Sequence, residues 1–230
     1  MLTYERFILE EIENKYKNNF FYSIKSAVQY QSGKEKMSDI KAEIKAQKIF
    51  DRFDTENFKK WFNGSKITSQ NFMKPDDSPG LVYHSSDDNF SKFNTPAFFG
   101  DGGTNSYSGD YFYYCVLQMK NPLEMRRSVL GKEQWMKKVG EILKDASRFE
   151  SRMDFADKYE DGYGFFKLLE GDKMFDPYRW DLVYKYINEN GYDGMIYRES
   201  DQIISWYFDG FLVMKPEQIK IVFKQSKSDD

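Results

Sequence analysis

Short runs of residues that favour β-strands are scattered among helical segments along this chain, and this irregular alternation constrains the fold more than any other feature. Strands are expected at Leu81–His84, Tyr111–Met119, Met195–Tyr197 and Phe211–Met214, where β-branched and aromatic residues gather. The helical segments between them are irregular, which argues against the repeating strand–helix pattern of a doubly wound sheet. The sequence therefore predicts a mixed α+β fold.

Apolar residues at helical spacing predict the positions of the main helices. Two stripes in the first sixty residues are separated by a break at Gln31–Gly33; they consist of Leu2, Phe7, Ile8, Ile12 and Tyr16, then Ile40, Ile44, Ile49, Phe50 and Phe53. Near the other end, Asp176 and Pro177 provide an N-cap and a first-turn proline for a helix of about four turns that ends near Gly191.

These elements predict one main domain with a helical extension. We expect the extension over residues 1–57 and the main domain over 58–224, with a helical insertion at about 125–175. Residues 225–230 are polar and are expected to form a flexible tail. The chain has 230 residues with 21 Phe, 17 Tyr and 4 Trp, so aromatic side chains should dominate its core.

The counts of a few residue types exclude several kinds of chemistry. A single histidine and a single cysteine exclude His-rich and Cys-based zinc sites and an intrachain disulfide, so no metal is expected. No P-loop or Rossmann glycine fingerprint occurs. The net charge of −3 argues against bulk binding to nucleic acid or to an anionic membrane. Without a signal-peptide layout or a spanning apolar run, the chain is expected to be soluble and cytoplasmic.

Six short motifs occur in an order that resembles one enzyme family. They are Trp61–Lys66 (WFNGSK), Tyr83–Ser86 (YHSS), Ala97–Phe99 (AFF), Asn121–Leu123 (NPL), Gly191–Gly194 (GYDG) and Pro216–Lys220 (PEQIK). In this order they resemble the ADP-ribosyltransferases of the diphtheria-toxin and poly(ADP-ribose) polymerase branch, which is known by a His-Tyr-Glu triad. The resemblance is strongest to transferase domains in polyvalent proteins of phages and mobile elements. It implies a split mixed or antiparallel β core and NAD as the cosubstrate.

Carried over residue by residue, the resemblance implies an NAD site around the single histidine. His84 would donate a hydrogen bond to a ribose hydroxyl, Ser85 would offer backbone contacts to the nicotinamide amide, and Ser86 would place a hydroxyl nearby. Phe98 stands where the family has the tyrosine of its second motif. Its ring keeps the π face that stacks on nicotinamide and lacks only the hydroxyl.

The segment after the second motif would complete the nicotinamide pocket. By the same resemblance, Thr104 would supply a hydroxyl that reads the carboxamide, and Tyr107 would close the pocket as a second stacking ring. Gly100, Gly102 and Gly103 would permit the close backbone turn between them.

The position of the family's catalytic glutamate is occupied by Gly210. The resemblance places that glutamate immediately before the last strand, where its carboxylate helps to stabilise the positive charge that develops on the ribose. Asp209 is the nearest carboxylate, but strand periodicity turns it to the opposite face unless the chain forms a bulge at Gly210. Glu199 and Asp201, expected on the preceding loop, are further candidates, and a site without a carboxylate is the remaining alternative.

The resemblance implies a mono-ADP-ribosyltransferase that transfers ADP-ribose from NAD to a protein or nucleic-acid acceptor and releases nicotinamide, as a phage or mobile-element effector or toxin would. Gly210 leaves a second hypothesis open, a catalytically degenerate module that binds NAD or ADP-ribose or interacts with a protein. A third hypothesis is a structural or interaction protein whose N-terminal helices dock a partner or an antitoxin.

Overall fold

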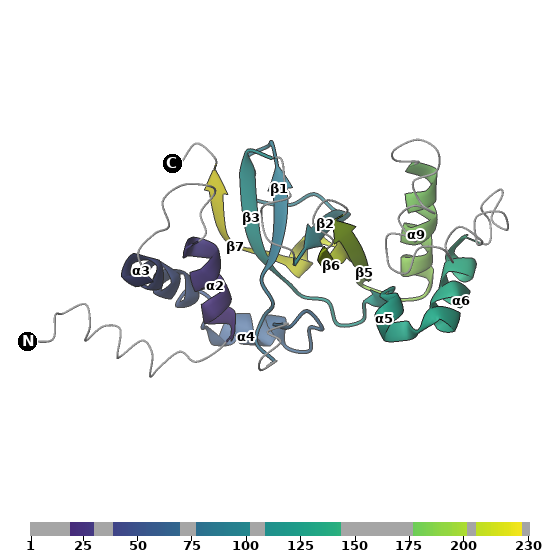
Figure 1. The fold of residues 1–230 in the computed structure, drawn as a ribbon, viewed down its shortest axis with the longest axis horizontal. Helices are drawn as coiled ribbons and strands as arrows, with labels where there is room; N and C mark the ends of the chain where they lie inside the picture. Colours follow the sequence, from purple (N-terminus) through teal and green to yellow (C-terminus); the bar gives the residue numbers. More distant parts are fainter. Residues whose placement is uncertain are drawn as a thin grey trace, which may run out of the picture. The chain divides into compact units, whose positions relative to one another are not determined.

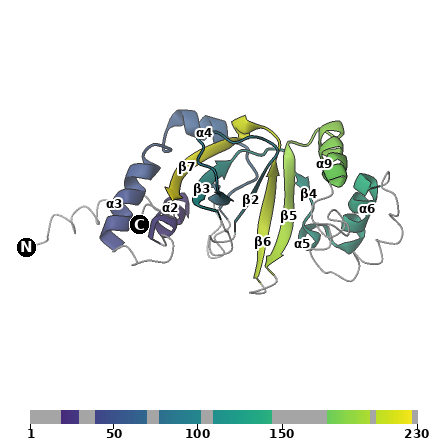
Figure 2. The same ribbon diagram turned by 90° about the horizontal axis from the view of Figure 1, so that it is seen from above.

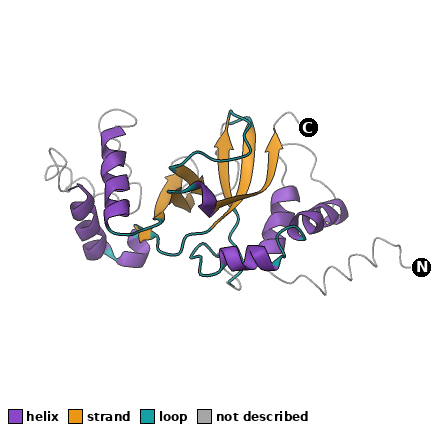
Figure 3. Ribbon diagram, turned by 180° about the vertical axis from the view of Figure 1, so that it is seen from behind, coloured by secondary structure: helices purple, strands orange, loops and turns teal. Residues whose placement is uncertain are grey.

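The computed structural model describes residues 19–29, 39–69, 77–101, 109–143, 177–201 and 206–226. The chain divides into two compact units. The first comprises residues 1–93, 103–119 and 216–230, and the second comprises residues 94–102 and 120–215. Helices and mostly antiparallel strands occur together in both units, which confirms the α+β class (Figure 3).

Among its described residues, the first unit has the strands β1 (Val82–Ser86), β3 (Tyr111–Leu117) and β7 (Ile219–Ser226), with β3 between the other two (Figure 1). Both pairings are antiparallel, and the β1–β3 register places His84 opposite Tyr113. A β-bulge shifts the β3–β7 register by one residue near the middle of β3. β3 carries most of the buried aromatic residues of this sheet, as its predicted strand character requires.

The helices described in this unit, α2 (Asn19–Gln29), α3 (Asp39–Phe50) and α4 (Glu56–Phe62), pack on this sheet. The α4 helix begins after Thr55, whose hydroxyl oxygen accepts a hydrogen bond from the Phe58 N–H at 3.2 Å. The apolar faces of the helices and strands form one buried cluster: Phe20, Phe21, Ile24, Ala27, Val28, Ala42, Ala46, Ile49, Phe50, Phe58, Phe62, Leu81, Phe112, Tyr114, Val116 and Val222. The second predicted helix is therefore confirmed as α3, with Ile49 and Phe50 of its stripe in the cluster. Ile40 and Ile44 are only half-buried, and Ala42 and Ala46 are buried in the cluster instead. The first predicted stripe, Leu2–Tyr16, lies outside the described residues.

In the described part of the second unit, β2 (Ala97–Gly100) pairs antiparallel with β6 (Trp206–Val213), and β6 pairs antiparallel with β5 (Gly194–Asp201). The short strand β4 (Leu123–Glu124) pairs parallel with β5 at the other side (Figure 2). This sheet is therefore mixed, with antiparallel pairing predominant.

The helices described in this unit are α5 (Arg127–Leu130), α6 (Lys132–Leu143) and α9 (Pro177–Glu189). They pack with one face of the sheet in a second buried cluster: Leu123, Met125, Trp135, Val139, Ile142, Leu143, Trp180, Val183, Ile187, Met195, Tyr197 and Leu212. The predicted helix at Pro177 is confirmed, and the chain turns after it at Gly191, whose φ of 71° lies in the region that glycine adopts without strain. The expected helical insertion is confirmed in α5 and α6, and residues 144–176 lie outside the description.

Two pairs of the six motifs meet in space. In the first unit, the Trp61 indole N–H donates a hydrogen bond to the Glu217 carbonyl at 3.0 Å, which joins the first motif to the last. In the second unit, the Asn121 side-chain amide donates to the Gly191 carbonyl at 3.0 Å, and the Asp193 N–H donates to the Asn121 carbonyl at 3.1 Å. These motifs therefore form hydrogen bonds between elements that lie far apart in the sequence.

Several strands extend beyond the predicted runs. β5 continues to Asp201, so the backbone of Glu199 and Asp201 lies in a strand and not on the expected loop, because the pairing with β6 continues along its whole length. β7 follows the short 3₁₀ helix η2 (Pro216–Gln218) and runs to Ser226. Gln225 and Ser226, the first two residues of the expected tail, are thus held by pairing with β3, and residues 227–230 lie outside the description.

The helices of the described ranges are short, from 4 residues in α5 to 13 residues in α9. None of them has the length and the apolar character that a bilayer crossing demands.

Candidate functional site

His84 lies on β1 of the first unit, half-buried against a group of aromatic rings. The Phe93 ring meets the imidazole edge-on, with the centroids 5.0 Å apart and an interplanar angle of 84°. Phe90 and Tyr113 lie further off, at 6.2 and 6.3 Å between centroids. The sequence predicts that the histidine lies on this strand, but its described aromatic neighbours come from the following turn and from β3.

The two serines after His84 both accept hydrogen bonds from backbone groups. Ser85 Oγ accepts the Gly109 N–H at 2.8 Å, and Ser86 Oγ accepts the Asp88 N–H at 3.0 Å. Gly109 lies so close to β1 that a Cβ there would be 2.6 Å from the Ser86 nitrogen, so only glycine fits. A hydroxyl that accepts one hydrogen bond can still donate its own proton.

Phe98 lies on β2 of the second unit and is half-buried. Its ring packs edge-to-face on Trp180 of α9, with the centroids 4.8 Å apart and an interplanar angle of 73°. It adjoins the buried cluster of this unit and stands opposite Leu212 in the β2–β6 register. The plane of the Phe98 ring is therefore fixed by packing within the second unit.

Part of the implied nicotinamide pocket falls outside the structure's description. Thr104 and Tyr107 lie in residues 102–108, which are not described, and so do Gly102 and Gly103. Gly100 is the last residue of β2 and stands opposite Gly210 on β6.

Gly210 has a structural explanation in the residue opposite it. In the β5–β6 ladder, Gly210 pairs with Tyr197, and a Cβ added at Gly210 would overlap the outer ring atoms of this buried tyrosine. The register of β6 is regular against both β2 and β5, so the bulge that would bring Asp209 to the same face as Gly210 is absent. Asp209 and Gly210 therefore face opposite sides of the sheet.

Asp209 is buried in a network of ion pairs. One carboxylate oxygen lies 2.5 Å from a terminal nitrogen of Arg126, and the other lies 4.0 Å from Nε of Arg198. Glu124 binds the remaining side of the Arg126 guanidinium through both carboxylate oxygens, at 2.8 and 2.6 Å. The hydrogen bonds that Arg126 donates to Glu124 and the negative charge of Asp209 raise the pKa of Arg126, so this side chain stays charged. Arg126 lies 83 residues before Asp209 in the sequence, and no local motif predicts their pairing.

Asp101 closes the end of the β2–β6 ladder. Its N–H donates to the Asp209 carbonyl at 3.0 Å, and its own carboxylate accepts the Asp209 N–H at 2.7 Å in place of a backbone carbonyl. Burial raises the pKa of Asp101 to about 6, and the negative charge of Asp209 adds to the effect. The hydrogen bond from Asp209 and the charge of Arg198 offset part of it. The sequence gives no sign of this carboxyl group's environment.

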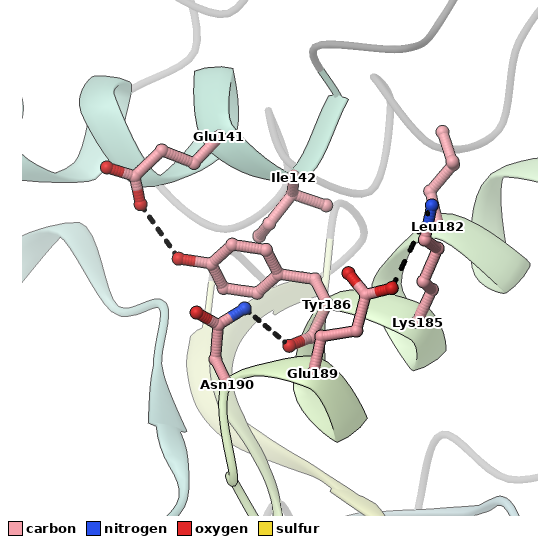
Figure 4. Close-up of a pocket in the computed structure, with 7 residues that line it drawn as sticks. All are labelled: Glu141, Ile142, Leu182, Lys185, Tyr186, Glu189 and Asn190. Atoms are coloured by element: carbon pink, nitrogen blue, oxygen red, sulfur yellow. Dashed lines mark hydrogen bonds and ion pairs between the residues drawn. The ribbon is translucent and has the colours of Figure 1, made fainter.

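A cavity of about 460 Å³ opens between α6 and α9 of the second unit (Figure 4). Tyr186 reaches from α9 toward α6, where its hydroxyl donates to the Glu141 carboxylate at 2.7 Å. Lys185 pairs with Glu189 on the same helix at 3.9 Å. The lining consists of Glu141, Ile142, Leu182, Lys185, Tyr186, Glu189 and Asn190, and none of the residues implied for NAD is among them.

The implied site residues are thus distributed over both units. His84, Ser85 and Ser86 belong to the first, and Phe98 and Asp209 belong to the second. No group of three or more His, Cys, Asp or Glu side chains that could hold a metal ion occurs within the described ranges. Comparison with protein-family models, with curated proteins and with solved structures found no match.

Proposed function

We propose that this protein is an NAD-dependent mono-ADP-ribosyltransferase with an ADP-ribosyltransferase-like split β core. The observation that carries the proposal is the ordered series of six motifs around a single histidine, which is half-buried on β1. The reaction breaks the bond between nicotinamide and ribose, and the acceptor, a protein or a nucleic acid, takes the ADP-ribose. A phage or mobile-element effector or toxin acting in the cytoplasm of a bacterial or infected cell fits this activity.

The implied roles are compatible with how the described side chains are held. The His84 ring is fixed by edge contacts with Phe93, and a hydrogen bond from it to a ribose hydroxyl would orient the sugar. The Phe98 ring is fixed against Trp180 and would stack on nicotinamide. Both features support the proposal because catalysis by positioning requires side chains with defined orientations.

The first experiment is incubation of the protein with labelled NAD and host lysate. We expect label on protein or nucleic acid together with released nicotinamide, and we expect His84→Ala to abolish both. His84→Ala removes a hydrogen bond that contributes about 0.5–1.5 kcal/mol and orients the sugar. Absence of label and of nicotinamide release with the parent protein contradicts the proposal, and full activity of His84→Ala shows that the histidine has no part in it.

A second candidate function is a module that binds NAD or ADP-ribose without transfer, and the environment of the glutamate position favours it. Tyr197 occupies the space beside Gly210, and Asp209 is held by Arg126 on the opposite face of the sheet. Calorimetry with NAD and with ADP-ribose separates the two hypotheses: binding without turnover supports the module. If turnover occurs, Glu199 and Asp201 are the next carboxylates to change, each to the corresponding amide.

The third hypothesis, a partner or antitoxin on the N-terminal helices, concerns their outer face. The apolar faces of α2 and α3 are buried in the first unit, whereas Lys41, Lys45 and Lys48 are exposed on α3. A partner on these helices would therefore contact the lysine face. If neither NAD nor ADP-ribose binds at millimolar concentration, this hypothesis becomes the leading one.

A further inference from the structure

Tyr113 is the buried residue that connects His84 to the turn after β1. It stands directly opposite His84 in the β1–β3 register, and its side chain is completely buried. Its ring stacks on Phe90, with the centroids 4.2 Å apart and an interplanar angle of 5°. All of these residues belong to the first unit.

The Tyr113 hydroxyl holds that turn at two points. It accepts a hydrogen bond from the Phe90 N–H at 2.8 Å and donates one to the Asp88 carbonyl at 3.0 Å. A phenylalanine would fill the same volume but would leave both backbone groups without this partner. The ring of Tyr113 accounts for the packing, and its hydroxyl accounts for the two hydrogen bonds that hold the turn.

The turn at residues 88–93 orients the imidazole through its two phenylalanines. Phe90 and Phe93 contact each other edge-to-face at 4.8 Å, and Phe93 meets His84 edge-on at 5.0 Å. Phe93 also packs edge-to-face on Tyr113 at 5.5 Å. Among the described rings near His84, the positions of Phe90 and Phe93 thus depend on the turn that the Tyr113 hydroxyl holds.

We propose that Tyr113 is the positioning residue for His84: its hydroxyl fixes the turn at residues 88–93, and the phenylalanines of that turn hold the imidazole in the orientation that binds NAD. This inference rests on the proposed function for the identity of the ligand. The geometric part of it, the control of the imidazole by Tyr113, stands on the contacts alone.

The matched pair of variants is Tyr113→Phe and Tyr114→Phe. Tyr114 is the next residue on β3, faces the other side of the sheet, and donates its buried hydroxyl to Gln225 at 2.9 Å. Each variant therefore removes one buried phenol oxygen from the same strand. Only Tyr113→Phe releases the turn beside His84, so Tyr114→Phe controls for the general loss of a buried hydroxyl.

The first readout is the proton NMR signal of the imidazole. Because His84 is the only histidine, its ring protons identify themselves without assignment. Rings at these distances displace its signals from those of a free histidine, and we expect Tyr113→Phe to move them toward the free position while Tyr114→Phe leaves them in place. Unchanged signals in folded Tyr113→Phe overturn the proposal. If Tyr113→Phe does not fold, Phe93→Leu, which removes the edge contact and keeps an apolar side chain, must produce the same displacement.

The second readout is the affinity for NAD, which a purely structural role would not change at equal stability. We expect Tyr113→Phe to weaken NAD binding by about tenfold, since a misplaced ring loses the ribose hydrogen bond. Tyr114→Phe should bind as the parent does. Equal NAD affinity in both variants, with displaced His84 signals in one, overturns the positioning role. If the parent itself binds no NAD, the proposed function fails, and the NMR comparison alone decides whether Tyr113 controls the imidazole.

Discussion

Gly210 and Tyr197 form a cross-strand pair in which the small residue makes room for the large one. A ring that covers a glycine in the neighbouring strand shields the backbone that glycine leaves bare. This pairing accounts for the glycine without any reference to catalysis. It also means that a glutamate at position 210 would displace a buried ring.

We predict that Gly210→Ala lowers the free energy of unfolding by about 1–3 kcal/mol, the usual cost of forcing an extra carbon into a packed site. Urea denaturation measures it. The double variant Gly210→Ala with Tyr197→Leu should cost less than the sum of the two single variants, because the leucine gives up the ring that the new methyl group meets. A single variant Gly210→Ala as stable as the parent would show that Tyr197 moves aside freely.

Asp101 makes stability depend on pH. Its pKa is raised from 3.8 to about 6 in the folded protein. Between about pH 4 and pH 6, Asp101 is therefore protonated in the folded state and ionised in the unfolded state. The contribution of Asp101 to the free energy of unfolding is fully present below about pH 4 and is lost as the pH rises through about 6. At about 1.4 kcal/mol for each pH unit between the two pKa values, the ionised carboxylate costs on the order of 3 kcal/mol above pH 6.

We therefore predict that Asp101→Asn raises the melting temperature at pH 7.5 and has a smaller effect at pH 5. The asparagine oxygen can still accept the Asp209 N–H, while the charge that opposes Asp209 is gone. The two positive charges of Arg126 and Arg198 are then balanced by the two negative charges of Asp209 and Glu124. The control Asp209→Asn should destabilise at both pH values because it leaves Arg126 without one partner. A melting-temperature difference independent of pH would contradict the role of Asp101.

At the scale of elements, Ser65 joins the end of α4 to the end of β3. Its hydroxyl donates to the Leu117 carbonyl at 2.9 Å and accepts the N–H groups of Ile67 and Met119, each at 3.2 Å. The buried Ser65 side chain thus provides hydrogen-bond partners for backbone groups at the ends of these elements.

We predict that Ser65→Ala lowers the free energy of unfolding by about 2–4 kcal/mol, because two buried N–H groups lose their acceptor. Thermal or urea unfolding provides the measurement. Ser23→Ala is the control, since the hydrogen bond described for the Ser23 hydroxyl, to the Asn19 carbonyl at 2.9 Å, stays within α2. Equal losses in the two variants would mean that the hydroxyl of Ser65 does not join the elements.

At the scale of the whole molecule, α2 and α3 share a buried core with the sheet of the first unit. Ile24 of α2 is completely buried in the cluster that contains Tyr114 and Val116 of β3. The sequence predicts the helices but gives no indication of what their apolar faces cover. The helical extension expected over residues 1–57 stays a prediction about domain organisation.

We predict that Ile24→Ala costs about 2–5 kcal/mol and accelerates hydrogen exchange at the β3 amides to a matching degree. Tyr22→Ala is the control, because Tyr22 is 47% exposed on the same helix and its loss should change stability by roughly 0.5 kcal/mol or less. If Ile24→Ala loosens α2 but leaves β3 protected, the helices fold independently of the sheet.

The sequence by itself determined the features that depend on neighbouring residues. Three such features are the helix that begins at Pro177, the α3 helix and the strand character of Tyr111–Leu117. They follow from caps, periodicity and β-propensity, which act over a few residues. The strand that carries His84 is predictable for the same reason.

The tertiary structure alone decided what the described functional candidates touch. Strand pairing fixed the length of β5, the absence of a bulge at Gly210 and the ring above it, because register is set between strands and not within one. It also brought Arg126 to Asp209 across 83 residues, and Tyr113 to the imidazole of His84. Such contacts depend on which segments the folded chain brings together, and no pattern within a single segment contains that information.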